Sequence, residues 1–259
     1  MNVFPSSVPA CMATEVGTAA QITDAQIEVR LGECDALNQT LDFYRGFFKD
    51  YGFQVCIAGG AIRDLIMLGD AHAIKDYDVW ALGADSENQQ LMENIAASLH
   101  DAYIARGFVN NPNHIHRPSR NRRYGMKSYI CHSVSLPWMH PEQVKPWDHE
   151  KYRGSHQQAQ IMLTPYGMQE LADSFDWKNC RFAYDGETAY VDGARYFYDQ
   201  KLALNLDDGV KLHAPMHTLS RGFYLQEKYR RSRYPVNVAT EDAALLGALV
   251  LHGRKGGKA

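Results

Sequence analysis

The chain has 259 residues, 45% of them hydrophobic, and a formal net charge of −3. These values are typical of a globular protein with one large or two modest domains, and they exclude an overall basic charge that would attract a polyanion. The five cysteines form no CxxC pair and no apolar run is long enough to span a bilayer, so we expect a cytoplasmic protein without a disulfide framework.

From residue 36 to about 105, helices alternate with short apolar strands. Residues 1–35 precede this pattern and are interpreted as an N-terminal lead-in. Apolar residues at helical spacing predict a helix over about 36–50, which Gly52 ends. The segments that follow are predicted in the order strand (QVCIA), Gly59-Gly60 turn, helix (AIRDLIML, closed by Gly69), strand (DYDVWAL) and helix (about 88–105).

Residues 107–155 differ in composition from the rest of the chain, because they are rich in His, Arg, Pro and Asn. We interpret them as a basic, histidine-rich insertion with one strand near KSYICHSV. We therefore expect a core over 36–205, and a helical C-terminal region over 206–259 that ends in a disordered tail. The elements predicted after the insertion are a strand (QQAQIMLT), a short helix (GMQELADS), two strands (KNCRFAYD and ETAYVDG) and helices over about 194–204, about 216–232 and from about 240, the last capped by Thr240.

Two aspartates at the start of one predicted strand, with a glycine turn before them, form the main candidate site. Because alternate residues of a strand point to the same face, Asp76 and Asp78 project side by side, and a hard divalent cation such as Mg²⁺ or Mn²⁺ relieves their repulsion. Gly59 and Gly60 lack a Cβ and begin a helix, where backbone N–H groups and the helix dipole favour an anion. Arg63, in the first turn of that helix, is within reach of a phosphate oxygen. Each feature is common by itself, and their order in the chain is what predicts a nucleotide site.

CIAGGAIRDLIMLG followed by KDYDVWAL resembles the signature of polymerase-β-type nucleotidyltransferases, in the form found in class II tRNA nucleotidyltransferases and bacterial poly(A) polymerases. That group reads GGxVRDxLLG, and then a strand ending in DxD. Two later segments, FDWKNCRFAYDGETAYVDG and MHTLSRGFYLQEKYRRSRYPVN, are fainter matches, so the resemblance covers roughly 52–83 and 170–237. A compact, divergent member of the kind that bacteriophages encode fits this pattern.

The resemblance implies an α+β fold, in which a small mixed sheet flanked by helices is followed by a helical neck. It also implies metal-dependent nucleotidyl transfer from a nucleoside triphosphate (NTP), with Asp76 and Asp78 as metal ligands. A third carboxylate in the wider superfamily is a base or a metal ligand, and Asp176 is the candidate for either role. The alternative interpretation of Asp176 is a turn residue before a strand, without a role in catalysis.

The chain departs from the family pattern in two places. Ser174 and Phe175 stand where the family has a pair of arginines, directly before the aspartate that corresponds to Asp176. The tRNA-finishing enzymes choose bases with a Glu-Asp-x-x-Arg element, and here Leu245 stands in place of the arginine. The second departure argues against CCA addition as the activity.

Two sets of cations are candidates for contact with the acceptor. A basic segment that contains an aromatic residue can follow a nucleic-acid backbone and stack a base. Arg221 and Lys228 are seven residues apart in a predicted helix and share one face. Both sets have alternatives, namely contact with triphosphate or a solvated surface. The basic segment contains Arg117, Arg120, Arg122 and Arg123, with Tyr124 beside them.

The predicted reaction is an in-line attack of an acceptor hydroxyl on the α-phosphate of an NTP, which releases pyrophosphate and is assisted by two divalent ions. An RNA 3′ end, such as that of a tRNA, is the favoured acceptor. Three alternatives stay open: transfer to a protein or small-molecule hydroxyl, an enzyme that joins nucleotides to one another, and a catalytically silent nucleic-acid-binding protein. The oligomeric state and the base preference do not follow from the sequence.

Overall fold

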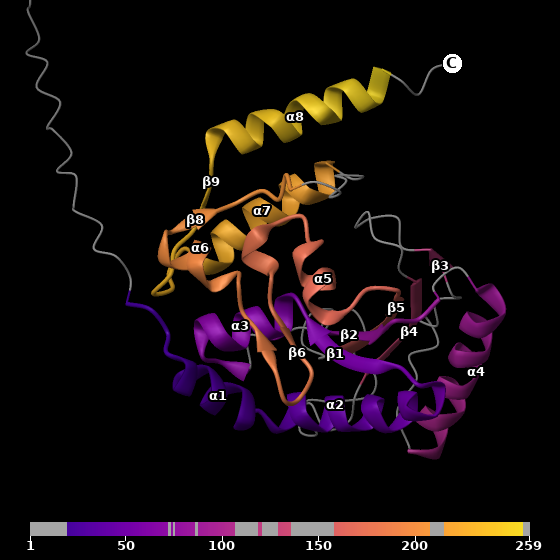
Figure 1. Cartoon of the computed structure of the whole chain (residues 1–259). Coiled ribbons are helices and arrows are strands. Elements are labelled where there is room, and N and C mark those ends of the chain that lie inside the picture. Colours follow the sequence, from indigo (N-terminus) through magenta and orange to yellow (C-terminus); the bar gives the residue numbers. More distant parts are fainter. Residues whose placement is uncertain are drawn as a thin grey trace, which may run out of the picture.

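A mixed sheet forms the centre of the computed structural model, which describes residues 20–71, 74, 76–85, 88–106, 119–120, 129–135, 158–207 and 215–255 (Figure 1). Its strands lie in the order β3-β4-β5-β2-β1-β6-β7. β2 and β5 pair in parallel, and the other neighbours pair antiparallel. The strands are β1 (Gln54–Ala58), β2 (Asp76–Leu82), β3 (Ser119–Arg120), β4 (Tyr129–Ser135), β5 (Gln158–Thr164), β6 (Ala183–Tyr184) and β7 (Ala189–Tyr190).

Helices cover the sheet and extend beyond it. Figure 1 shows α1 and α2 along one side of the sheet and α7 and α8 on the other side. In the ranges given above, no helix has both the length and the apolar character needed to cross a bilayer. The helices are α1 (Asp24–Gly32), α2 (Asp35–Phe48), α3 (Gly60–Leu68), α4 (Gln89–Ala105), α5 (Met168–Asp173), α6 (Ala194–Tyr198), α7 (Pro215–Tyr229) and α8 (Thr240–Lys255).

The core lies between α2 and the central strands. Leu37, Leu41, Tyr44 and Phe48 recur at helical spacing along α2, and all four are buried. The central strands β1 and β2 are nearly continuous apolar runs, because helices or neighbouring strands cover them on every side. The helix over about 36–50, the strands QVCIA and DYDVWAL and the helix over about 88–105 were predicted, and the structure confirms them.

The predicted turn and helix after β1 are also confirmed. Gly59 has φ +79° and ψ −123°, a backbone conformation that residues with a side chain rarely adopt. The helix α3 begins at the next residue and ends at Gly69, which has φ +69° and donates its N–H to the carbonyl oxygen of Leu65. The two glycines therefore fix both ends of α3.

Three segments that were predicted as regular elements are shorter than expected, and one of them is ETAYVDG, of which only Ala189–Tyr190 is a strand. Only Ala183–Tyr184 of KNCRFAYD is a strand, because Lys178–Cys180 forms a 3-10 turn. The Asn179 side chain donates to the carbonyl oxygen of Lys201 and accepts from the N–H of Ala203, so it takes the place of a strand partner. The helix expected over about 194–204 ends at Tyr198. Lys201–Leu202 is a short strand (β8) that pairs with Asn237–Val238 (β9).

Two details at helix ends also differ from expectation. The helix α1 lies inside the expected lead-in and begins with a capping box, in which Thr23 and Gln26 exchange side-chain hydrogen bonds with backbone N–H groups. Its buried residues, Ile27 and Leu31, attach it to the core. Thr240 does not cap α8, because the first helical hydrogen bond runs from the N–H of Ala243 to the carbonyl oxygen of Ala239.

The helix α7 is docked against the core through a close approach at Gly222. A Cβ at Gly222 would lie 2.5 Å from Cζ2 of Trp177, which is closer than real Cβ atoms come to other atoms. The indole N–H of Trp177 donates to the carbonyl oxygen of Thr218 at 2.9 Å, one turn earlier in α7. A side chain at position 222 would therefore push α7 away from the ring that holds it.

Gly222→Ala should lower the free energy of unfolding by about 1–3 kcal/mol, because overpacking against the Trp177 ring outweighs the gain in helix propensity. Gly247→Ala is the matched control, since Gly247 lies within α8 and a Cβ there would meet no atom within 4 Å. That variant should gain about 0.5–1 kcal/mol. Urea unfolding of both variants checks the pair. Equal effects of the two substitutions would contradict the close approach.

Candidate functional site

Asp76 and Asp78 lie at the beginning of β2, where β1 has already turned away. β1 pairs with β2 over Val79–Leu82, and the chain leaves the sheet at Gly59. β5 continues to pair with β2 back to Asp76, so the strand stays regular on that side. Asp76 is exposed and Asp78 is half-buried, while the residue between them is buried. The two carboxylates therefore share one face of a fixed strand beside an opening in the sheet.

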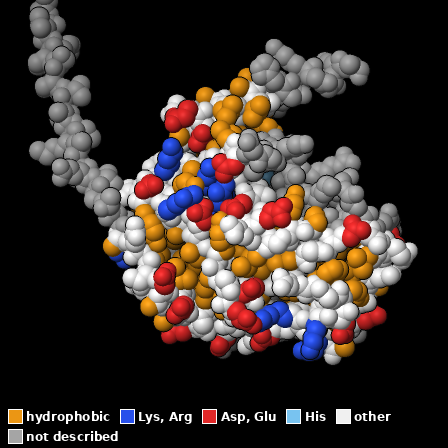
Figure 2. Space-filling view, viewed as in Figure 1, with side chains coloured by type: hydrophobic (Ala, Val, Ile, Leu, Met, Phe, Trp, Pro, Cys, Tyr) orange, Lys and Arg blue, Asp and Glu red, His pale blue; other side chains and the backbone are white. Residues whose placement is uncertain are grey.

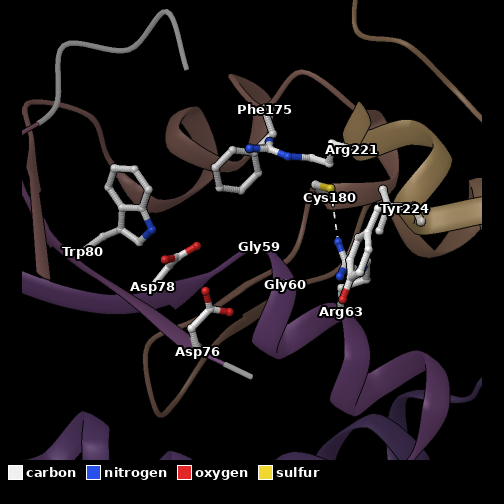
Figure 3. Close-up of a pocket in the computed structure, with 11 residues that line it drawn as sticks. Gly59, Gly60, Arg63, Asp76, Asp78, Trp80, Phe175, Cys180, Arg221 and Tyr224 are labelled. Carbon is white, nitrogen blue, oxygen red and sulfur yellow. Dashed lines mark hydrogen bonds between the residues drawn. The ribbon is translucent and has the colours of Figure 1, made fainter. Parts of the chain in front are cut away.

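A cavity of about 220 Å³ opens next to the carboxylates (Figure 3). The turn at Gly59, the helix α3, the strand β2, the segment from Phe175 to Cys180 and the helix α7 enclose it. All five residues predicted for nucleotide and metal binding line this cavity. The lining residues are Gly59, Gly60, Arg63, Asp76, Asp78, Trp80, Phe175, Cys180, Arg221, Tyr224 and Leu225.

The environment of Asp78 makes its carboxyl group a weaker acid than that of an exposed aspartate. Burial and the neighbouring charge of Asp76 raise the pKa of Asp78 to about 7, although Arg221 and Arg63 oppose this shift. The pair therefore takes up a proton near neutral pH. The same repulsion favours a divalent cation, which would replace that proton.

The sequence predicted that the backbone N–H groups of Gly59 and Gly60 would both be available to a phosphate, but the N–H of Gly59 is not. The N–H of Gly59 donates to the carbonyl oxygen of Phe182 at 2.7 Å, and the carbonyl oxygen of Gly59 accepts from the N–H of Arg63 at 3.0 Å. Gly59 thus serves to turn the chain, and its N–H is already used. The first N–H groups of α3, beginning with that of Gly60, have no partner within the helix and carry the positive end of its dipole. They are the anion donors that the turn presents.

Arg63 lines the cavity as predicted, but internal contacts hold it. Its guanidinium lies 2.8 Å from the carboxylate of Asp64, and its Nη1 donates to Sγ of Cys180 at 3.3 Å (Figure 3). The hydroxyl of Tyr229 also donates to Asp64, at 2.6 Å. Arg63 and Asp64 are both buried, so neither is simply a solvent-exposed helix residue. Arg63 gives the cavity wall a fixed positive charge.

The two α7 cations predicted for acceptor contact also form ion pairs with core carboxylates. Lys228 Nζ binds Asp64, and Arg221 Nη1 donates to Asp176 at 2.8 Å. The Lys228 and Arg221 side chains are only 14% and 19% exposed. Their shared face therefore points toward the core, and of the two only Arg221 lines the cavity.

Asp176 binds Arg221 from behind the cavity wall. Its carboxylate accepts from Nη1 of Arg221 and, at 2.8 Å, from the hydroxyl of Thr218. The part of the chain that the structure describes has no group of three or more His, Cys, Asp or Glu side chains placed to hold a metal. Asp176 therefore does not join Asp76 and Asp78 in such a group, and its alternative role as a base stays a prediction. Its contacts orient Arg221.

The other predicted acceptor contacts fall largely outside the described ranges. Arg117, Arg122 and Arg123 lie outside them. Arg120 is described only by its backbone, which lies in the edge strand β3 and pairs with Tyr129 of β4. On the face of the molecule shown in Figure 2, Lys and Arg side chains lie beside Asp and Glu side chains. A path of cations from Arg120 to the cavity stays a prediction.

Five lining residues of the cavity were not predicted: Trp80, Phe175, Cys180, Tyr224 and Leu225. The sequence held a signal for Trp80, which follows Asp78 by two positions and so shares its strand face. Phe175 stood where the resembled family has an arginine. A Cβ at Gly59 would lie 3.7 Å from the Phe175 ring, so the ring packs directly against this glycine. No local pattern marks the α7 residues as part of a cavity.

No protein-family model and no curated protein sequence matches the chain. Solved structures of CCA-adding enzymes resemble it. The Thermotoga maritima CCA-adding enzyme complexed with tRNA is 15% identical, covers 88% of this chain and gives a TM-score of 0.50. The chain has the nucleotidyltransferase fold. A CCA-adding enzyme in apo form I is also 15% identical, covers 90% of the chain and gives a TM-score of 0.49. The chain spans 45% of the length of the first of these enzymes and 46% of the second.

The nucleotidyltransferase fold implies a divalent metal, and the donors of this cavity fit one. Asp76 and Asp78 offer carboxylate oxygens, the ligand type that Mg²⁺ and Mn²⁺ prefer. Two carboxylates do not complete a coordination shell, but Mg²⁺ usually keeps several waters and shares the oxygens of a substrate phosphate. Burial is the first cause of the raised pKa of Asp78, and the charge of Asp76 is the second; a bound cation would relieve that second cause.

We expect the affinity for Mn²⁺ or Mg²⁺ to rise between about pH 6 and pH 8, because the proton on Asp78 competes with the cation below its pKa of about 7. The dependence should approach about tenfold per pH unit at the acid end and level off above the pKa. Metal titration of the nucleotide-free protein, by calorimetry or by the electron paramagnetic resonance of Mn²⁺, measures it. Affinity that is constant over this range would refute the prediction.

Asp78→Asn should remove the pH dependence together with the metal affinity, while Asp199→Asn, at an exposed position that does not line the cavity, should keep both. The metal-free stability gives a second measurement. A carboxyl whose pKa is raised by folding loses stabilisation as the pH rises toward that pKa. Asp78→Asn should therefore unfold at a higher temperature than the wild type at about pH 8 without metal.

Proposed function

We propose that the protein is a metal-dependent nucleotidyltransferase that moves a nucleoside monophosphate from an NTP to an acceptor hydroxyl. One observation carries the proposal: two strand-end carboxylates face a cationic wall across one cavity. The wall consists of the N-terminus of α3, Arg63 and Arg221. Carboxylates that hold a cation, with cations and helix N–H groups nearby, are what a triphosphate requires.

Each residue of the cavity has a role in this proposal. Asp76 and Asp78 would hold the divalent ion, which neutralises charge on the phosphate oxygens when it is bound. The first N–H groups of α3 would donate to the anion, and Arg221 would add a cation that is held by Asp176, whose carboxylate also accepts from Thr218. Arg63 contributes charge from a fixed position. Most of the catalytic effect would then be positioning and electrostatic stabilisation.

Asp76→Asn and Asp78→Asn should each lower nucleotide transfer by at least about a hundredfold, because each removes one carboxylate of the metal site. The assay incubates the protein with each labelled NTP, Mg²⁺, total cellular RNA and total protein, and follows the fraction that becomes labelled. Asp199→Asn is the matched control and should keep wild-type transfer. Wild-type turnover by either cavity variant would make the metal assignment wrong.

The proposed acceptor is an RNA 3′ end, such as that of a tRNA. Support comes from the basic segment around Arg120 and Tyr124, and by analogy from the similar CCA-adding enzyme, which was solved with tRNA. CCA addition itself is not proposed, because Leu245 replaces the arginine of the base-choosing element.

Transfer to a protein or small-molecule hydroxyl is the second candidate. The ion pairs of Arg221 and Lys228 with core carboxylates favour it, since those two cations are engaged within the protein. The labelling experiment separates the two candidates directly, because the label enters either RNA, protein or a small product. An absence of label in every fraction, with no NTP bound, would favour the catalytically silent binder.

Reversing Arg120 and Arg122 to Glu should reduce RNA labelling far more than NTP binding, because cations along the path of an RNA end contact its phosphates. The dependence of RNA binding on salt should also flatten, by about 0.7–0.9 of a log unit per log unit of salt for each lost phosphate contact. Lys49→Glu with Lys201→Glu, two exposed lysines outside the basic segment, is the control with the same change in net charge. If the Arg120 and Arg122 variant labels RNA normally, RNA is not the acceptor that this segment serves.

A further inference from the structure

The indole of Trp80 presents a hydrogen-bond donor to the cavity that none of the described residues accepts. Trp80 lines the cavity and is 1% exposed. Its Nε1 has no hydrogen-bond partner among the described residues. Figure 3 shows the nitrogen edge of the ring turned toward Asp78. An indole N–H can only donate, so a satisfactory partner must bring an oxygen or another acceptor.

The contrast with Trp177 shows that this donor is unusual. Trp177 is as deeply buried, but its Nε1 donates to the carbonyl oxygen of Thr218 at 2.9 Å. Buried polar groups in proteins nearly always have a partner, and a lost partner costs free energy. Trp80 therefore keeps an unfavourable group at the wall of the site in the free protein.

Trp80 cannot turn to find a partner elsewhere. It lies in the central strand β2, where it pairs with Cys56 of β1 and with Met162 of β5. The ring of Phe175 lies beside it, with ring centroids 6.4 Å apart. Because the backbone is held on both sides and the ring is packed, the acceptor has to arrive through the cavity.

The chemistry of the cavity identifies the class of acceptor. Trp80 follows Asp78 by two residues on the same strand face, so its N–H lies next to the carboxylates proposed to hold the metal. On the other side are Arg63, Arg221 and the N-terminus of α3. A ligand that fits these groups together carries several anionic or polar oxygens.

We infer that Trp80 is a nucleotide-binding residue, whose indole N–H donates to an oxygen of the bound Mg²⁺-nucleoside triphosphate. The inference rests on the proposed function. It adds a residue that fixes the position of the nucleotide relative to Asp78, and it explains why a buried donor has no partner among the residues that the structure describes.

The test compares Trp80→Phe with Trp177→Phe, the same substitution at an indole whose donor already has a partner. Calorimetry of the full chain measures the affinity for Mg²⁺-NTP and for Mg²⁺-tripolyphosphate, and thermal unfolding without ligand measures stability. Trp80→Phe should weaken Mg²⁺-NTP at least about tenfold, as expected for a lost hydrogen bond to a charged or polar oxygen. Its melting temperature should fall less than that of Trp177→Phe, because the loss of packing around the smaller ring is partly offset by the removal of an unpaired donor.

Trp177→Phe should show the opposite pattern. The carbonyl oxygen of Thr218 loses its donor, so the melting temperature should fall by several degrees while the nucleotide affinity falls less than in Trp80→Phe. Weaker binding of both ligands by Trp80→Phe places the accepting oxygen on the phosphates, and weaker binding of the NTP alone places it on the nucleoside. Either result supports the inference.

Unchanged Mg²⁺-NTP affinity in Trp80→Phe would overturn the inference and leave the proposed function standing. The same conclusion follows if Trp80→Phe loses stability and affinity in parallel, as Trp177→Phe would for a purely structural ring. If the wild type binds no NTP at all, the proposed function and the inference fail together.

Discussion

The buried carboxylate of Asp64 joins the two helices that form the cationic side of the cavity. It accepts from Arg63 in its own helix α3, and from Lys228 and Tyr229 in α7. Without Asp64, the buried Arg63 and the partly buried Lys228 would face each other without a counter-charge, and an unpaired buried charge costs about 3–5 kcal/mol. α7 therefore cannot leave α3 without a large penalty, and Arg221, which α7 carries into the cavity, depends on this contact.

The same principle explains how charge is distributed around the site. Asp64 balances Arg63 and Lys228, and Asp176 balances Arg221. These cations are held by internal carboxylates, so they form a fixed wall whose geometry does not have to be created when a ligand binds. Opposite that wall, burial and the charge of Asp76 raise the pKa of Asp78. A cation and an anionic ligand together satisfy both sides of such a cavity better than either does alone.

The core and the carboxylate pair could be predicted because local signals and tertiary structure agree there. Gly59 is needed for a positive φ at the end of a buried strand, and Asp76 and Asp78 share a face through the two-residue period of a strand. Prediction failed where a side chain replaced backbone pairing. Asn179 holds Lys201 and Ala203 through its amide, and no periodicity in KNCRFAYD reports that contact. The contacts of Asp176 were not predicted for a similar reason, because its partners Thr218 and Arg221 are distant in sequence.

The seven-residue spacing of Arg221 and Lys228 shows what a helical pattern does and does not determine. It correctly places the two side chains on one face of α7. It does not say whether that face meets solvent or the core, because long cations can bury their stems and pair with an internal carboxylate. Here Asp64 and Asp176 decide the direction, and both partners are invisible to a pattern confined to one helix. For basic residues that are predicted to contact an acceptor, the buried carboxylates near them decide whether their charge is available, and for Arg221 and Lys228 those carboxylates are Asp176 and Asp64.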